Sequence, residues 1–245
     1  MKLLVINPNT CEEMTDDIRY TIQKIVSANV VCEVVSPDFG PRSLESFYDY
    51  SLATFGIQRL LYKKESDYNG ILIACFGDPG LFSYKEIANC PVLGIAESSI
   101  SMSLLLGDKF AILGASNKAI PMMSNMVRQY GLDTRFAGAW ALNMSVLDVE
   151  SNKQEATKRL IATGQAAKEK GADVLILGCA GMTGLTTPVE EALQMPILDP
   201  VECGYRALEM MVFAGYKTAK SGLFSTPSAQ QIVREELLKG QNGAL

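Results

Sequence analysis

Two stretches of this chain share one pattern, in which a short apolar run ends at a cysteine and a glycine-rich turn follows. The first reads GILIACFGDPGL from Gly70 to Leu81, and the second reads DVLILGCAGMTGL from Asp173 to Leu185. A Pro-aliphatic-Leu triplet follows each cysteine at nearly the same distance, and another apolar run precedes each at a similar distance. Agreement at these landmarks indicates an internal duplication.

The duplication constrains the fold. Short apolar runs alternate with helix-period segments, which is typical of βα units around a mostly parallel sheet. The sequence therefore predicts an α/β protein with two pseudo-twofold-related lobes, each a mostly parallel sheet flanked by helices, and a cleft between them. We expect lobes at residues 1–107 and 108–208, with a C-terminal helix and tail, 209–245, packing on them. The expected strands are 3–6, 30–36, 71–74, 92–95, 110–113, 134–137, 174–177 and 197–198.

Several helix ends can be predicted from local signals. Capping boxes predict helix starts at Thr10 and Thr187, and Asp78 followed by proline predicts a third. A further helix is expected from 204 to about 216, and a short one near 230–239.

Charge and composition limit the classes of partner that this chain can bind. The chain has 245 residues and a net charge of −5, which argues against nucleic acid or an anionic membrane as a partner. No apolar run is long enough for a membrane-spanning helix, and the first apolar run meets an Asn-Pro-Asn turn too soon for a signal peptide. We therefore expect a cytoplasmic protein that binds a small molecule.

The residue types limit the chemistry. The chain has no histidine, and its six cysteines form no C-x-x-C pair. We therefore expect reduced thiols and no metal site. Without a phosphate-binding glycine motif, no nucleotide cofactor is expected either. Proton transfer would fall to cysteine, carboxylate, lysine or tyrosine.

Cys75 and Cys179 are the candidate functional pair. Each is predicted at the carboxyl end of a strand, where ligands gather in open α/β sheets. Backbone N–H groups and the helix dipole there stabilise a thiolate. The alternative is that both are buried structural cysteines; their matched places in the duplication favour a functional pair.

Two loops are candidates for ligand binding. Asn7 follows the first strand, where its amide could hold a carbonyl or ureido group, although a turn with a helix cap would also explain this segment. By symmetry the loop containing Ala115 and Ser116 should face the same cleft. The methionines at 122 and 123 are interpreted as core filling.

The segments VINPNT, ACFGDPGL and LGCAGM resemble the aspartate/glutamate racemase superfamily, and more closely its hydantoin and allantoin racemase branch. The resemblance covers most of the chain. It implies a cofactor-independent, homo-oligomeric racemase in which Cys75 and Cys179 flank C5 of a hydantoin ring, one removing the C5 proton and the other returning a proton. The residues implied to stabilise the enolate through their N–H groups are Phe76, Gly77, Ala180 and Gly181.

One departure bears on the substrate. Relatives usually have Thr-Thr where this chain has Gly114-Ala115, so two hydroxyl donors are lost and Ser116 is a possible substitute. Phe39 and residues near Ser43 are candidates for the pocket of the C5 substituent.

Other functions stay open at this point. They are an amino-acid racemase of the same superfamily, a decarboxylase relative that uses one cysteine, a non-catalytic binding module, and a redox dithiol that forms a Cys75–Cys179 disulfide.

Overall fold

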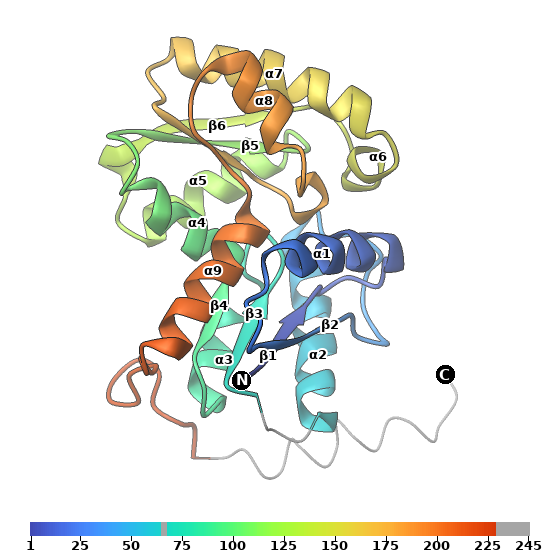
Figure 1. Ribbon diagram of the computed structural model, residues 1–245, viewed down its shortest axis with the longest axis vertical. Helices are drawn as coiled ribbons and strands as arrows, with labels where there is room; N and C mark the ends of the chain where they lie inside the picture. Colours follow the sequence, from blue (N-terminus) through green and yellow to red (C-terminus); the bar gives the residue numbers. More distant parts are fainter. Residues whose placement is uncertain (65–67, 229–245) are drawn as a thin grey trace.

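Two parallel four-stranded sheets form the framework of the computed structural model, which describes residues 1–64 and 68–228 (Figure 1). The first has the order β2-β1-β3-β4 and the second the order β6-β5-β7-β8, so both halves repeat one topology. This arrangement confirms the predicted fold class. The strands are β1 (Lys2–Ile6), β2 (Val31–Val35), β3 (Gly70–Ile73), β4 (Val92–Gly94), β5 (Phe110–Gly114), β6 (Phe136–Ala141), β7 (Val174–Leu177) and β8 (Ile197–Leu198).

Helices connect and cover these strands. In the first half they are α1 (Glu12–Ile25), α2 (Phe47–Lys63), α3 (Leu81–Ile87) and α4 (Ile95–Ser103). In the second half they are α5 (Ala119–Gln129), α6 (Val146–Ser151), α7 (Lys153–Glu169), α8 (Thr186–Leu193) and α9 (Pro200–Phe213), with 3-10 turns η1 (Asp133–Arg135) and η2 (Ala180–Met182). No helix in the described ranges is long and apolar enough to cross a membrane.

Apart from Lys2 at the start of β1, the central strands consist of apolar residues and glycine, as expected for strands covered by helices on both faces. In β1, β3, β5 and β7 nearly every residue is buried, and their side chains form the cores of the two halves. The carboxyl ends of β3 and β7 are thereby held rigidly, and both cysteine turns begin there.

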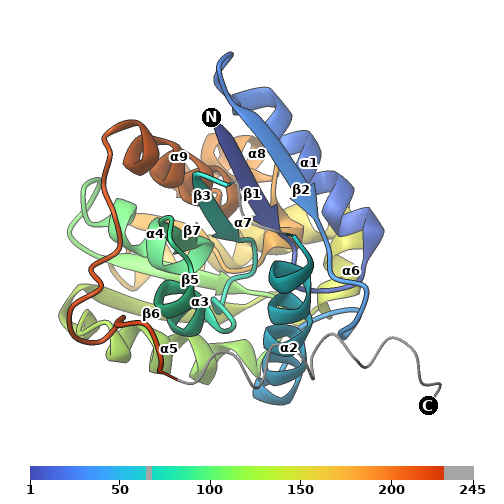
Figure 2. The same ribbon diagram turned by 90° about the horizontal axis from the view of Figure 1, so that it is seen from below.

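Helix α9 joins the halves. It follows the last strand of the second sheet but packs on β3, β4, α1 and α4 of the first (Figures 1 and 2). A Cβ atom at Gly204 would lie 2.9 Å from Ile95 Cγ2, so glycine permits this close approach. The proposed boundary at 208 falls inside α9, and the division into lobes stays a prediction.

Some local predictions were wrong. Helix α1 begins at Glu12 after Cys11, without a side-chain cap, because the Thr10 hydroxyl donates to Pro41 O instead. Helix α8 begins at Thr186, and β6 begins at Phe136, after the η1 turn.

Helix α9 starts at Pro200, where the Asp199 carboxylate accepts hydrogen bonds from Val201 N and Glu202 N. The predicted helix at 230–239 lies outside the described residues.

Candidate active site

Cys75 begins the turn after β3. Its carbonyl accepts a hydrogen bond from Asp78 N at 3.0 Å, and Ala74 N donates to Ile6 O in the neighbouring strand at 2.8 Å. Gly77 in this turn has a φ of 157°, and a Cβ atom there would lie 2.2 Å from the Tyr50 hydroxyl. Glycine therefore lets Tyr50 of α2 close over the Cys75 turn, where its hydroxyl donates to Phe76 O.

Cys179 occupies the equivalent place after β7 and precedes η2. Gly178 N donates to Leu113 O of the neighbouring strand at 2.8 Å, the counterpart of the bond made by Ala74. The Cys179 carbonyl accepts from Met182 N, which closes the turn. Matching strand ends thus present the two thiols in the same way, one from each sheet.

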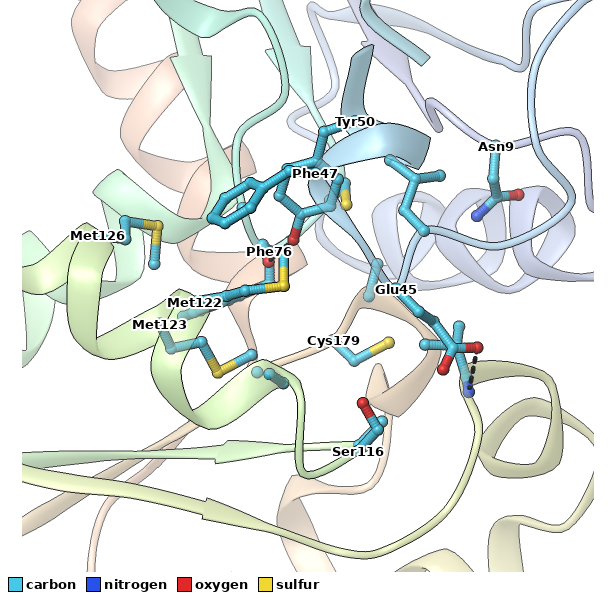
Figure 3. Close-up of a pocket in the computed structure, with 18 of the residues that line it drawn as sticks. Asn9, Glu45, Phe47, Tyr50, Phe76, Ser116, Met122, Met123, Met126 and Cys179 are labelled. Atoms are coloured by element: carbon cyan, nitrogen blue, oxygen red, sulfur yellow. Dashed lines mark hydrogen bonds between the residues drawn. The ribbon is translucent and has the colours of Figure 1, made fainter. Parts of the chain in front are cut away.

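Both cysteines line one pocket of about 140 Å³ (Figure 3). Its size suits a small organic molecule. The polar residues that line it are Asn9, Glu45, Tyr50, Ser116, Asn125 and Gln129. Its apolar side chains include Met14, Leu44, Phe47, Met122, Met123, Met126 and Val146. In Figure 3 the three α5 methionines lie on one side of Cys179, and Asn9 and Glu45 lie on the other.

The two thiols differ in their electrostatic surroundings. Burial raises the pKa of Cys179 to about 11, while the Gly181 N–H and the Lys153 ammonium lower it and Glu150 and Glu45 raise it further. Burial also raises the pKa of Cys75 well above its ordinary value, and the charges of Cys179 and Asp78 add to this rise. Ionisation of one thiol therefore opposes ionisation of the other.

The carboxylate of Asp78, which ends the Cys75 turn, is buried. It accepts hydrogen bonds from Ala96 N and Glu97 N and so caps α4. Asp78 thus caps a helix other than the one predicted to start beside it, because α3 begins later, after Gly80.

Five of the predicted binding residues line the pocket: Phe76, Gly77, Ala115, Ser116 and Ala180. Their contact with a ligand stays a prediction. Gly181 lies behind the pocket wall, where a Cβ atom would be 3.5 Å from Cys179 Sγ, and its N–H bonds the thiol.

Asn7 and Phe39 do not line the pocket. The Asn7 amide is fully buried and donates to Asn9 Oδ1 in its own loop and to Thr15 Oγ1 in α1, and Asn9 lines the pocket in its place. Phe39 packs edge-on against Phe55 with a ring-centroid distance of 5.7 Å. Both side chains are held by neighbours in the first half.

Sequence reasoning predicted one further wall of the pocket in part and missed another: residues near Ser43 were candidates, and Leu44 and Glu45 line the pocket. The first wall is the segment before α2 and its first turns, which supplies Glu45, Phe47 and Tyr50; the other is α5, which supplies Met122 and Met126. The only local signal was a cap, in which Ser46 Oγ accepts from Asp49 N at the start of α2. That signal locates the helix but not the cleft it faces.

All six cysteines are free thiols. Across the described ranges, 1–64 and 68–228, no cluster of three or more His, Cys, Asp or Glu side chains could hold a metal ion.

Comparison with known proteins shows the family of this chain. The family model for Asp/Glu/Hydantoin racemase matches residues 3–208. A hydantoin racemase from Paenarthrobacter aurescens is 33% identical over 94% of this chain and 99% of its own length. The allantoin racemase structure from Klebsiella pneumoniae is 30% identical, with a TM-score of 0.88 over 93% of this chain and 94% of that one. That of Pseudomonas fluorescens is 26% identical, with a TM-score of 0.90 over 95% and 99%.

The two-lobed fold and these matches define an isomerase of the racemase type. More particularly, the chain belongs to the Asp/Glu/hydantoin racemase family, in its hydantoin and allantoin racemase branch.

Proposed function

We propose that this protein is a cofactor-independent, two-base racemase of 5-substituted hydantoins. The observation that carries the proposal is the placement of Cys75 and Cys179, which end equivalent strands of separate sheets and line one pocket. The named relatives and structures are racemases of this substrate class, which supports it.

The reaction needs one thiolate and one thiol. The thiolate takes the C5 proton from one face of the ring, and the electron pair moves into the neighbouring carbonyl to give an enolate. The opposite thiol then gives its proton to C5 from the other face, so the ring inverts and the cysteines exchange protonation states. The charge of one cysteine raises the pKa of the other, which favours a pair with one thiolate and one thiol.

The turns after the two strands supply hydrogen-bond donors for the enolate oxygen. Ala180 begins η2, and the first N–H groups of a helical turn have no partner within it. The backbone bonds of the Cys75 turn use Asp78 N. We therefore propose Phe76, Gly77 and Ala180 as the N–H donors, an arrangement that stabilises developing negative charge.

The pocket favours a neutral ring over a free amino acid. Among the described residues that line it there is no lysine or arginine, and Glu45 is the charged side chain present. An α-carboxylate would lack a cationic partner and would be repelled by Glu45. This observation counts against an amino-acid racemase.

The wall formed by α5 suits an apolar C5 substituent. Met122, Met123 and Met126 lie together on one side of the pocket, near Phe47 (Figure 3). Methionine adapts to irregular apolar groups and makes favourable contacts with aromatic rings. Ala115 adds no hydroxyl to this lining. We therefore expect aryl- or alkyl-substituted hydantoins to be better substrates than allantoin, whose C5 carries a polar ureido group.

Proton NMR with polarimetry in D₂O tests the proposal. Enantiopure 5-benzylhydantoin, 5-isobutylhydantoin and allantoin are each followed with and without enzyme, because the C5 proton of hydantoins exchanges slowly unaided. We expect loss of rotation matched by C5 deuteration, faster for the two apolar substrates. No acceleration for any hydantoin would overturn the proposal, and equal rates for allantoin would overturn the substrate preference.

We also propose, from the family resemblance, that the protein works in the cytoplasm as a homo-oligomer. Light scattering with size-exclusion chromatography tests the oligomeric state.

A further inference from the structure

A cluster of three charged residues lies directly behind Cys179. Lys153, the first residue of α7, donates to Gly181 O at 2.6 Å and pairs with Glu150 of α6 at 3.1 Å. It also pairs with Asp17 of α1 at 2.9 Å. One ammonium group therefore joins the η2 turn to helices from both halves of the molecule.

This cluster supports the thiol through the turn. The Lys153 bond fixes the carbonyl of Gly181, and the N–H of the same residue bonds the Cys179 thiol. A charged donor makes this the stronger type of hydrogen bond. The turn is thus held with its N–H directed at the sulfur, where it stabilises a thiolate.

The turn that carries Cys75 is braced without a cation. Its partners are the neutral phenol of Tyr50, which donates to Phe76 O, and the buried carboxyl of Asp78. Asp78 and the Cys179 charge both oppose a thiolate at Cys75. The two turns have equivalent backbone bonds, but an ammonium group bonds the backbone of the Cys179 turn alone among the described residues.

We propose that Lys153 is a positioning residue that makes Cys179, rather than Cys75, the thiol that ionises first in the free enzyme. The charged groups that face Cys179 are Lys153 from α7, Glu150 from α6 and Glu45 from the segment before α2, with Asp17 of α1 on the far side of Lys153 and Cys75 across the pocket. Lys153 is the cation among them. The resting enzyme then accepts the enantiomer whose C5 proton faces Cys179.

Thiol alkylation tests this without turnover. The inference rests on the proposed function, but its test does not, because iodoacetamide reacts with a thiolate whether or not any hydantoin is a substrate. The rate at each cysteine is measured by peptide mass spectrometry from pH 6.5 to 10. In the wild-type protein Cys179 should react faster than Cys75 at each pH of this range, because a larger fraction of it is ionised.

The variant Lys153→Met should slow alkylation of Cys179 at neutral pH by about tenfold, because an adjacent opposite charge lowers a pKa by a unit or more. The alkylation rate at Cys75 should change by less than about twofold, which is well below the change expected at Cys179. Lys153→Arg keeps the charge and should restore most of the Cys179 rate. Lys158→Met removes an exposed charge from the same helix and serves as the matched control.

Asp17→Asn separates charge from packing, because it breaks the ion pair with α1 and leaves the ammonium at Gly181 O. It should retain the Cys179 rate. The proposal is overturned if Cys75 reacts faster than Cys179 across this range in the wild type, or if Lys153→Met leaves the rate at Cys179 unchanged. Equal slowing of both cysteines in Lys153→Met, or a comparable loss in Asp17→Asn, would also overturn it, since packing alone would then explain the effect.

Discussion

At Cys75 and Cys179, burial opposes the charge that proton abstraction requires. A thiolate taken out of water loses hydration, so its pKa rises, and each thiol carries this effect. The Gly181 N–H and Lys153 offset part of it at Cys179. The protein therefore keeps a strong base in a pocket where the charge of one thiolate opposes formation of the other.

Replacing either cysteine by serine should abolish racemisation, with a loss of at least about a hundredfold, because a serine hydroxyl is a far weaker acid than a thiol and supplies almost no anionic base near neutral pH. Each single variant should retain slow C5 deuterium exchange on one enantiomer, since one thiol remains. The measurement is polarimetry beside proton NMR in D₂O.

Cys90→Ser is the matched control, because Cys90 is half-buried and outside the pocket. It should leave racemisation unchanged. Full racemisation by both Cys75→Ser and Cys179→Ser would contradict a two-thiol mechanism.

Among the elements, the start of α4 depends on a residue from a distant turn. Asp78 has a φ of 46° and caps α4 through Ala96 N and Glu97 N at 3.0 and 2.8 Å. A Cβ atom at Gly94 would lie 2.1 Å from Asp78 Cγ, so glycine makes room for the carboxylate. The helix and the Cys75 turn therefore stabilise each other.

Asp78→Ala should lower the free energy of unfolding by about 1–2 kcal/mol, because two N–H groups at the start of α4 lose their acceptor. Urea unfolding followed by circular dichroism measures the change. Asp108→Ala removes a carboxylate that is 78% exposed, and should have little effect. Equal stability of the wild type and Asp78→Ala would contradict the capping role.

The same carboxyl gives stability a pH dependence. Burial, and then the charge of Glu97, raises the pKa of Asp78 from 3.8 to about 7. Between these values the folded protein holds a proton that the unfolded chain has released, so this residue's contribution to stability falls as pH rises from about 4 to about 7. Relative to Asp78→Asn, which does not titrate, the wild type should lose stability across this window.

The sequence predicted the elements that depend on local pattern. The buried strands were found because continuous apolar runs identify covered parallel strands, and both cysteine turns were found because the duplication repeats them. The cap of α4 was missed because Asp78 precedes Ala96 by a whole strand and helix. Nothing near Asp78 in the chain marks its partner.

The same distinction explains the pocket. Phe76, Gly77, Ala115, Ser116 and Ala180 follow strand ends, so topology alone brings them to the cleft. The α5 methionines and the segment before α2 reach it only through packing between halves, which no local pattern records. Asn9 lines the pocket and Asn7 does not, because the buried hydrogen bonds of the Asn7 amide hold it away from the cleft.

At the scale of the whole molecule, the two halves are joined by a buried polar seam formed by Thr21, Thr183 and Asp199. Thr183 follows η2, its hydroxyl donates to Asp199 at 2.7 Å, and it lies 3.0 Å from the hydroxyl of Thr21 in α1. Asp199 also accepts from Gly184 N at 2.9 Å and caps α9. The Cys179 turn is therefore tied to α1 and to the helix that returns to the first sheet.

Thr183→Val keeps the shape of the side chain and removes its hydroxyl. It should lower the free energy of unfolding by about 1–2 kcal/mol, because the hydroxyl of Thr21 and one carboxylate oxygen of Asp199 lose a buried partner. Urea unfolding again provides the measurement. Thr187→Val, at an exposed position in α8, is the control. If Thr183→Val unfolds with the same free energy as the wild type and Thr187→Val, the stabilising role of these hydrogen bonds is contradicted.

The two thiols share no strand, helix or sheet, so the distance a proton must travel to and from the ring is set by how the halves are joined rather than by the residues that touch the ligand. Engineering this protein for a wider ring would then begin at Thr21, Thr183 and Asp199, where the spacing is maintained. Substitutions on α5 would change which side group is tolerated and leave that spacing in place.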